Sequence, residues 1–150
     1  MRIVIVGGVA AGMSAAARAR RLDESAEIIV LERGEHVSFA NCGLPYYVGG
    51  EIEQQSSLLV QTPASLRAAL NLDVRVNTEA VGLDAGAKIL TLRTAAGEER
   101  LEYDALILAP GAFALHPPIA GLDSPRVHTL RTVADAVTLR QMVEDGAKKA

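Results

Sequence analysis

The first 32 residues contain the pattern that most restricts the fold. Ile3–Val6 is a short apolar run bounded by glycine, which predicts a strand buried on both faces. A glycine-rich turn, Gly7–Gly12, follows it, and the alanine-rich segment from Ala11 to about Leu22 predicts a helix. Ile28–Leu31 predicts a second buried strand. Strand, glycine turn, helix and strand in this order predict a βαβ unit, and therefore an α/β fold.

The glycine turn has the features of a diphosphate site. A diphosphate is bound by backbone N–H groups at a helix N-terminus, where side chains must not block its approach. Gly7 permits the tight turn, and Gly12 permits close contact between helix and strand. The pattern G-x-G-x-x-G would place its second glycine at position 9, where this chain has Val9. We expect Gly8 to supply part of the missing room.

Glu32 ends the second predicted strand, 20 residues after Gly12 (32 − 12). A carboxylate at this place can accept hydrogen bonds from the ribose hydroxyls of an adenosine, and it repels a 2′-phosphate. The combination predicts binding of FAD or NAD. The alternative is a glycine-rich turn followed by a surface glutamate.

The middle of the chain predicts a further helix and five strands. Thr62 is suited to cap a helix that starts at Pro63 and runs to about Leu70. We expect strands at Asp73–Val76, Ala80–Leu83, Lys88–Arg93, Glu99–Tyr103 and Ala105–Ala109. Short turns separate the middle three and predict a small antiparallel meander. The wholly apolar last strand predicts another buried parallel strand.

The end of the chain predicts a linker and one helix. Ala112–Pro125 is rich in proline, which is typical of a linker. Thr132 and Asp135 have the spacing of a capping box, at the start of a helix that would run to about Glu144.

Composition excludes several functional classes. The 150 residues are 49% hydrophobic, and their net charge of −3 argues against nucleic acid as the main partner. No apolar run approaches the roughly 18 residues of a membrane span. His36, His116 and His128 lack the spacing of metal ligands, so no metal is expected. Arg2 alone is a weak basic region for an exported leader, so we expect a cytoplasmic protein.

Cys42 is the only cysteine, which excludes a disulfide within the chain. A single thiolate can cycle with a mixed disulfide or with a sulfenic acid. Leu44 and Pro45 suggest the beginning of a helix, which would place Cys42 at the positive end of a helix dipole. The alternative is a buried structural cysteine.

The segment Ser38–Tyr47, S-F-A-N-C-G-L-P-Y-Y, carries a resemblance to a known family. Together with the βαβ unit and Leu106–Ala112, it resembles the flavoprotein pyridine nucleotide–disulfide oxidoreductases. It is most similar to their single-cysteine branch, which comprises coenzyme A-disulfide reductase, NADH oxidase and NADH peroxidase. Within this branch the resemblance is greatest to coenzyme A-disulfide reductase, including relatives that carry a rhodanese domain or reduce persulfides. The resemblance implies a three-layer, Rossmann-like FAD/NAD(P)-binding domain. Its central parallel sheet would have helices on one side and a small antiparallel β-meander.

The resemblance also implies roles for individual residues. FAD would be held by Gly7, Gly8, Ala11, Gly12, Glu32, Arg33, Ala80, Ala109, Pro110 and Gly111. Cys42 would be the redox-active residue beside the flavin. The route of coenzyme A, as substrate or adduct, would be lined by Ser14, Arg18, Arg21, Ser38 and Asn41.

Arg18 and Arg21 are three residues apart and therefore share a helix face. Two guanidinium groups on one face can clamp the phosphates of coenzyme A. The alternative is a solvated face, since Arg18, Arg20 and Arg21 together also suit the C-terminal end of a helix dipole. A lysine expected from the resemblance at position 70 is replaced by Leu70.

The implied protein is an NAD(P)H-dependent reductase of coenzyme A disulfide, or of a related disulfide or persulfide. Residues 1–111 would be the N-terminal part of its FAD-binding domain, and 112–150 a linker and helix leading to an NADH-binding domain. We expect this chain to be the N-terminal piece of a longer homodimeric enzyme, with a small thiol or disulfide as its partner. NADH oxidase or peroxidase, a non-catalytic dinucleotide-binding module and an inert folded piece remain as alternatives.

Overall fold

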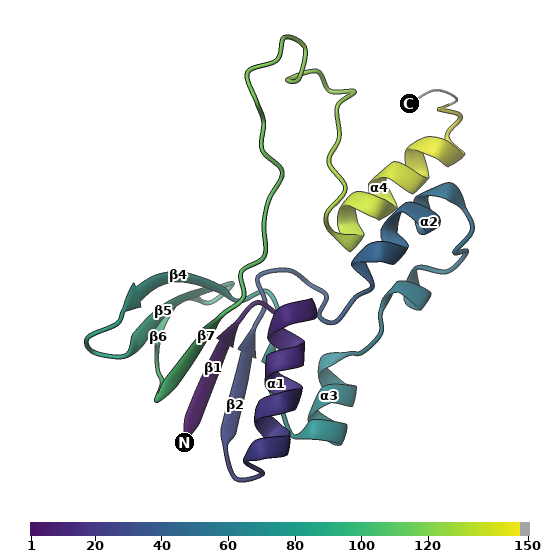
Figure 1. Ribbon diagram of the computed structural model, residues 1–150. Helices are drawn as coiled ribbons and strands as arrows, with labels where there is room; N and C mark the ends of the chain where they lie inside the picture. The colour runs from purple at the N-terminus through teal and green to yellow at the C-terminus, as the bar shows by residue number, and fades with distance from the viewer. Residues whose placement is uncertain (148–150) are drawn as a thin grey trace. The chain divides into compact units, whose positions relative to one another are not determined.

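The structure, a computed structural model, describes residues 1–147 and forms two compact units (Figure 1). The first unit contains Met1–Ser38 and Gln61–Gly111, and the second contains Phe39–Val60 and the described residues from Ala112 onward. The elements of the first unit are β1 (Arg2–Val6), α1 (Ala10–Leu22), β2 (Glu27–Leu31), α3 (Pro63–Leu70), β3 (Asp73–Arg75), β4 (Glu79–Asp84), β5 (Ile89–Thr94), β6 (Gly97–Glu102) and β7 (Ala105–Leu108). Those of the second are the short 3₁₀ helices η1 (Asn41–Gly43) and η2 (Gln55–Leu58), and the α-helices α2 (Leu44–Gly49) and α4 (Val133–Glu144).

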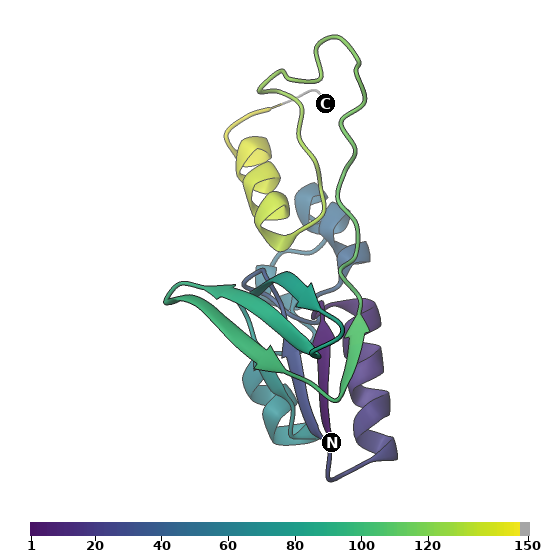
Figure 2. The ribbon, with the colours of Figure 1, turned by 90° about the vertical axis from the view of Figure 1, so that its left-hand side faces the viewer.

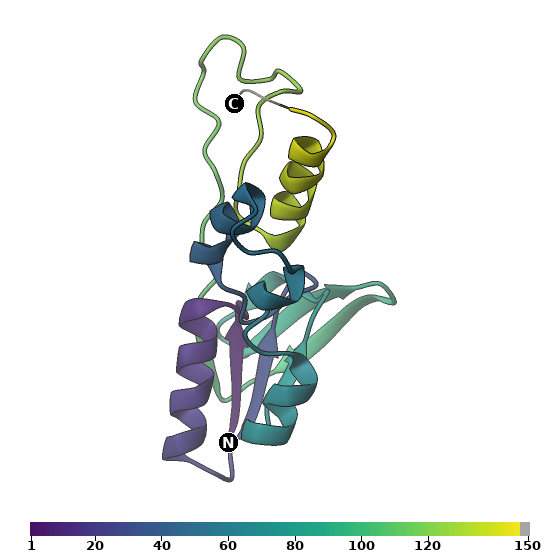
Figure 3. The same cartoon turned by 90° about the vertical axis from the view of Figure 1, so that its right-hand side faces the viewer.

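A parallel four-stranded sheet forms the centre of the first unit, in the order β3-β2-β1-β7. Successive residues of its strands are buried on opposite faces, as period-two side-chain alternation requires. Ile3 and Ile5 join the core beneath α1 and α3, whereas Val4 joins the core on the other face. Figure 3 shows the two helices covering the first of these faces. The strand β1 is therefore buried on both faces, as its apolar sequence predicts.

The antiparallel meander β4-β5-β6 covers the second face of the sheet (Figure 2). Leu90, Leu92 and Leu101 pack there against Val4 and Ile29. The predicted α/β architecture of helices, parallel sheet and small meander is confirmed.

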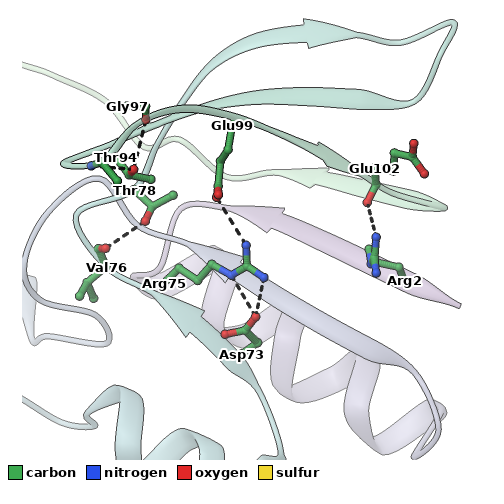
Figure 4. Close-up of polar contacts among 10 residues, drawn as sticks. Arg2, Asp73, Arg75, Val76, Thr78, Thr94, Gly97, Glu99 and Glu102 are labelled. Atoms are coloured by element: carbon green, nitrogen blue, oxygen red, sulfur yellow. Dashed lines mark hydrogen bonds and ion pairs between the residues drawn. The ribbon is translucent and has the colours of Figure 1, made fainter.

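Arg75 adds a polar connection between the two sheets (Figure 4). Its Nη2 lies 2.8 Å from Asp73 Oδ2 on the same strand, and its Nη1 lies 3.7 Å from Glu99 Oε1 on β6. Both pairs are partly exposed, so each contributes at most about 1 kcal/mol to stability.

The second unit is built around α2 and α4. Leu44, Leu58, Val133 and Ala136 form its buried core. Most of the segment between residues 112 and 131 is exposed and irregular, as its composition indicates. The contacts of the residues around Cys42 therefore group them with the C-terminal segment in one unit. The expected assignment of residues 1–111 to the FAD-binding domain, and of 112–150 to a linker and helix leading to an NADH-binding domain, stays a prediction.

The capping box predicted for α4 is present. The Thr132 side chain accepts a hydrogen bond from the Asp135 N–H at 3.1 Å. The Asp135 carboxylate accepts hydrogen bonds from the N–H groups of Arg131 and Thr132, at 2.9 and 2.8 Å. Burial by itself would raise the pKa of Asp135, but these hydrogen bonds and that of the Thr132 side chain hold the pKa below its usual value.

Element ends differ slightly from the predictions. Helix α1 begins at Ala10, one residue earlier than expected, with Val9 as its N-cap.

In the part of the chain that the structure describes, no helix combines the length and apolar character needed to cross a membrane.

Candidate functional site

The carboxyl ends of β1, β2 and β7 bring the predicted cofactor residues of the first unit together. The Gly7 N–H donates to the carbonyl of Leu31 at 2.8 Å. The Ala109 N–H donates to the carbonyl of Val6, also at 2.8 Å. The turn after β1 is thereby joined to the ends of both neighbouring strands, which is where α/β sheets bind their ligands.

Two glycines of the turn are required by close backbone approaches. Gly7 has a φ of +106°, and a Cβ there would collide with the carbonyl oxygen of Ala109. A Cβ on Gly12 would collide with the carbonyl oxygen of Gly7 and lie 3.3 Å from Ile5 Cγ2. Helix α1 can therefore begin tightly against the end of β1, as predicted from these glycines.

Gly8 has a different structural role from the one expected. A Cβ on Gly8 would lie 2.9 Å from Glu32 Cβ and 2.9 Å from Val37 Cγ1, so the missing side chain makes room for protein atoms. Val9 has a φ of −107° and a ψ of −128°, so its φ is negative but the pair lies outside both the helical and the extended region. The residue in the place of the second glycine of the G-x-G-x-x-G pattern therefore does not adopt the positive φ for which glycine is favoured.

The N-terminus of α1 is suited to an anion. Within the described residues, no side chain caps the helix from Val9, and its first turn is formed by Ala10, Ala11 and Gly12. The first N–H groups of a helix lack intrahelical acceptors, and they attract anions because the helix dipole is positive there. Ala11 is exposed, so this donor end is accessible to a ligand such as a diphosphate.

Glu32 is held firmly beside the turn. Its Oε2 accepts a hydrogen bond from the Gly8 N–H and its Oε1 one from the Gly34 N–H, both at 2.8 Å. A carboxylate offers about four lone-pair sites, so acceptor capacity remains for ribose hydroxyls. The site therefore fits the adenosine diphosphate portion of FAD, which would extend from the α1 N-terminus to Glu32.

The remaining predicted FAD residues lie around the same edge of the first unit. The Thr78 N–H donates to the Glu32 carbonyl at 3.0 Å, which places the start of the Ala80 segment beside Glu32. Ala80 is half-buried in β4, and Arg33 is exposed next to Glu32. Ala109 is half-buried; Pro110 and Gly111 are exposed, and Gly111 has a φ of +71°. Their contacts with a cofactor stay predictions.

Cys42 is an exposed, free cysteine in the second unit. It is the middle residue of η1, which leads directly into α2, so the predicted helix beginning at Leu44 is confirmed. Gly43 is buried, and a Cβ there would lie 3.0 Å from Leu58 Cδ2. The alternative of a buried structural cysteine is wrong, because the turn buries Gly43 and leaves the thiol accessible.

The predicted coenzyme A residues fall into two groups. Ser14, Arg18 and Arg21 are exposed, and their spacing of four and three residues places them on one face of α1. Ser38 ends the first unit, whereas Asn41 is exposed in the second. Ser38 has a φ of +48°, and its N–H donates to the Gly8 carbonyl at 2.8 Å. A left-handed serine at such a position is a strained conformation of a kind found at functional sites.

Arg20 has a structural role that the sequence analysis missed. It is buried, and its guanidinium donates to the carbonyls of Leu70, Asn71, Asp23 and Glu24 at 2.7–3.2 Å. It thus ties the end of α1 to the end of α3. The spacing of Met13, Ala16 and Arg20 along the buried stripe of α1 is the signal that could have revealed it.

Other sites on the molecule are less suited to chemistry. An open cavity of about 570 Å³ lies at the opposite, amino-terminal edge of the sheet, and its lining includes Arg2, Glu27, Lys88 and Asp104. Among residues 1–147, no cluster of histidine, cysteine and acidic side chains could hold a metal ion.

Comparison with known proteins identifies the family. The family model described as pyridine nucleotide-disulphide oxidoreductase matches residues 1–148. The chain belongs to this family. Family membership implies binding of FAD and a nicotinamide nucleotide, in agreement with the glycine turn, the α1 N-terminus and Glu32.

Individual members of the family are similar over nearly the whole chain. The chain is 35% identical over 152 residues to the coenzyme A disulfide reductase of Staphylococcus haemolyticus, covering 99% of this chain and 34% of that protein. It is 31% identical over 151 residues to an NADH oxidase of Methanocaldococcus jannaschii, again covering 99% and 34%. The crystal structure of the reduced CoADR-RHD of Bacillus anthracis matches with a TM-score of 0.92 and 45% identity, over 96% of this chain and 26% of that one. The chain therefore spans about a third of the curated relatives it matches.

Proposed function

We propose that the chain is the N-terminal, FAD-binding part of an NAD(P)H-dependent enzyme that reduces coenzyme A disulfide, or a related disulfide or persulfide, through Cys42. The observation that carries the proposal is the exposed thiol of Cys42 in a chain of this oxidoreductase family. The relative named coenzyme A disulfide reductase supports the choice of substrate.

The first unit would hold the cofactor. When bound, FAD would supply the electron pair that originates from the nicotinamide nucleotide. The open N–H groups of α1 would bind its diphosphate, and the fixed carboxylate of Glu32 would orient its ribose. The chain segment Ala109–Gly111 would border the diphosphate.

A short stretch of chain connects Cys42 to the glycine turn. Ser38 is hydrogen-bonded to the Gly8 carbonyl and precedes Cys42 by four residues. Four fully extended residues span at most about 14 Å. Cys42 is thereby tethered to the glycine turn, which supports a role for the thiol in the chemistry of the bound cofactor.

Cys42 would act by thiol–disulfide exchange. Its thiolate attacks one sulfur of the substrate disulfide, which forms a Cys42 mixed disulfide and releases the first thiolate. Two electrons then cleave this mixed disulfide, regenerating the Cys42 thiolate and releasing the second thiolate. Protonation of the two released thiolates completes the reduction. Arg18 and Arg21 would bind the phosphates of coenzyme A from the exposed face of α1.

A Cys42→Ser substitution in the full-length enzyme tests this proposal. We expect NAD(P)H-dependent reduction of coenzyme A disulfide to fall on the order of 10³-fold or more, because serine cannot form the mixed disulfide. Reduction of ferricyanide, which needs the cofactor but no thiol exchange, should stay near the wild-type rate. Ser57→Ala, an exposed change in the same unit, is the matched control. Full retention of disulfide reduction by Cys42→Ser would refute the proposal.

A second candidate is an NADH oxidase, favoured by the relative of that name. Cys42 would then cycle between thiolate and sulfenic acid. Oxygen consumption with NADH, and no NADH-dependent cleavage of coenzyme A disulfide, would support this candidate. A non-catalytic module would bind the dinucleotide and show neither activity.

A further inference from the structure

Arg140 of α4 holds the C-terminal end of α2, the helix that follows Cys42. Its Nη1 donates to the Tyr47 carbonyl at 3.0 Å, and its guanidinium carbon lies 5.9 Å from the centroid of the Tyr47 ring. Its Nε pairs with Glu144 Oε1 at 2.6 Å, one turn along α4. The Arg140 side chain is only 24% exposed. A planar guanidinium with two directed hydrogen bonds is a rigid connector.

Gly50 makes room for this contact. It ends α2 in a left-handed conformation with a φ of +89°, and a Cβ there would lie 2.8 Å from Arg140 Nη1. At the neighbouring Gly49, by contrast, a Cβ would meet no described atom within 4 Å. The two glycines therefore differ: a side chain at position 50 would displace the guanidinium and also strain the left-handed backbone, and one at position 49 would do neither.

The other end of α2 is held by packing. Leu44 is 2% exposed and lies in the core that Leu58, Val133 and Ala136 form. Figure 3 shows α2 lying along α4. Cys42 precedes Leu44 by two residues and is itself exposed. Its position therefore depends on where α2 is held against α4, because its own side chain is not enclosed by a packed wall.

We propose that Arg140 is a positioning residue for Cys42, acting through the Tyr47 carbonyl and α2. This inference rests on the function proposed above. Loss of the guanidinium leaves only apolar packing, by Leu44, Tyr47 and Val48, to hold this six-residue helix. Such packing is not directional, so the helix with its preceding 3₁₀ turn can then shift. Thiol–disulfide exchange requires the thiolate to approach the sulfur–sulfur bond along a narrow path, so a displacement near 1 Å lowers the rate about 100-fold.

The test compares two activities of the full-length holoenzyme after Arg140→Ala. We expect kcat for coenzyme A disulfide to fall about 10- to 100-fold, with a smaller change in KM. Ferricyanide reduction should remain near the wild-type rate, because it needs no thiol exchange. Arg126→Ala, which removes an exposed arginine of the same unit, should alter neither activity.

Chemical rescue separates positioning from general loss of structure. Millimolar methylguanidinium should restore part of the lost kcat in Arg140→Ala and leave the wild type unchanged, whereas urea at the same concentration should restore none. Arg140→Lys should lie between the wild type and Arg140→Ala. Gly50→Ala should reproduce the defect, while Gly49→Ala should not.

An unchanged kcat in Arg140→Ala overturns the inference, as does a parallel loss of ferricyanide reduction without rescue. Should Arg140→Ala fail to fold, Arg140→Lys decides: a kcat equal to that of the wild type overturns the inference. Cys42→Ser distinguishes the two proposals. If that variant keeps its disulfide reductase activity, the proposed function fails; if it loses the activity while Arg140→Ala keeps it, only the role of Arg140 fails.

Discussion

The Gly8 N–H donates a 2.8 Å hydrogen bond to Oε2 of Glu32. The residue expected to bind the ribose is thereby attached to the turn expected to bind the diphosphate. A Cβ on Gly8 would collide with Glu32 Cβ, so the contact also requires glycine at position 8. The two halves of the candidate dinucleotide site are therefore one structural unit.

Glu32→Gln should weaken both FAD binding and folding. A glutamine has one acceptor oxygen, so its amide nitrogen would face the N–H donor of either Gly8 or Gly34. We expect a loss of about 1–3 kcal/mol in unfolding free energy and about 10- to 100-fold in FAD affinity. Urea unfolding and flavin fluorescence titration measure these quantities. Glu35→Gln, an exposed neighbour, is the control, and equal behaviour of the two variants would contradict the role of Glu32.

Gly12→Ala should destabilise the first unit strongly. The added Cβ collides with the carbonyl oxygen of Gly7, a backbone atom that cannot move without shifting β1. We expect a cost of roughly 3 kcal/mol, at the upper end for overpacking. Gly49→Ala, whose Cβ meets no described atom within 4 Å, should cost nothing. Similar urea midpoints for the two variants would show that stability does not depend on the close approach of Gly12 to the Gly7 carbonyl.

Arg20→Lys and Arg21→Lys should differ although the residues are adjacent. Arg20 donates to four backbone carbonyls, and a lysine cannot reach all of them from one ammonium group. We expect Arg20→Lys to cost about 2–4 kcal/mol and Arg21→Lys, at an exposed position, about zero. Thermal or urea unfolding tests this, and equal stabilities would argue against the carbonyl clamp.

Asp135 should make α4 sensitive to acid. Its pKa is lowered in the folded state, so folding favours the carboxylate. The resulting stabilisation is present above the usual pKa of aspartate, near 4, and is lost as the pH falls through the lower folded-state pKa. Asp135→Asn should therefore cost about 1 kcal/mol at pH 7 and less near pH 3. Asp123→Asn, at an exposed position, serves as the control; a cost for Asp135→Asn independent of pH would contradict the expected linkage.

Much of the fold was predictable because the signals are local. The apolar runs at Ile3–Val6 and Ile28–Leu31 have no polar face, so only a sheet covered on both sides buries them. Thr132 and Asp135 satisfy each other across one helical turn, and their spacing alone reveals it. Glu32 follows its strand directly, so its place at the carboxyl edge also follows from the sequence.

Other features depend on contacts between distant segments. In the sequence Arg20 is one of three cations at a helix end, and only the position of α3 shows that it meets Leu70 and Asn71. Arg140 contacts Tyr47 across 93 residues of chain, which no spacing rule reveals. The association of Phe39–Val60 with the C-terminal segment likewise depends on the packing of Leu44 and Leu58 against α4.

We propose that the Cys42 thiolate exchanges with coenzyme A disulfide and forms a mixed disulfide with coenzyme A. Intact mass of the full-length protein, purified without thiol reagents, tests it most directly when measured before and after reduction. We predict that reduction removes one coenzyme A moiety, and that peptide mapping places the adduct on Cys42. Loss of a single oxygen from Cys42, or no change in mass together with no adduct after incubation with coenzyme A disulfide, would contradict it.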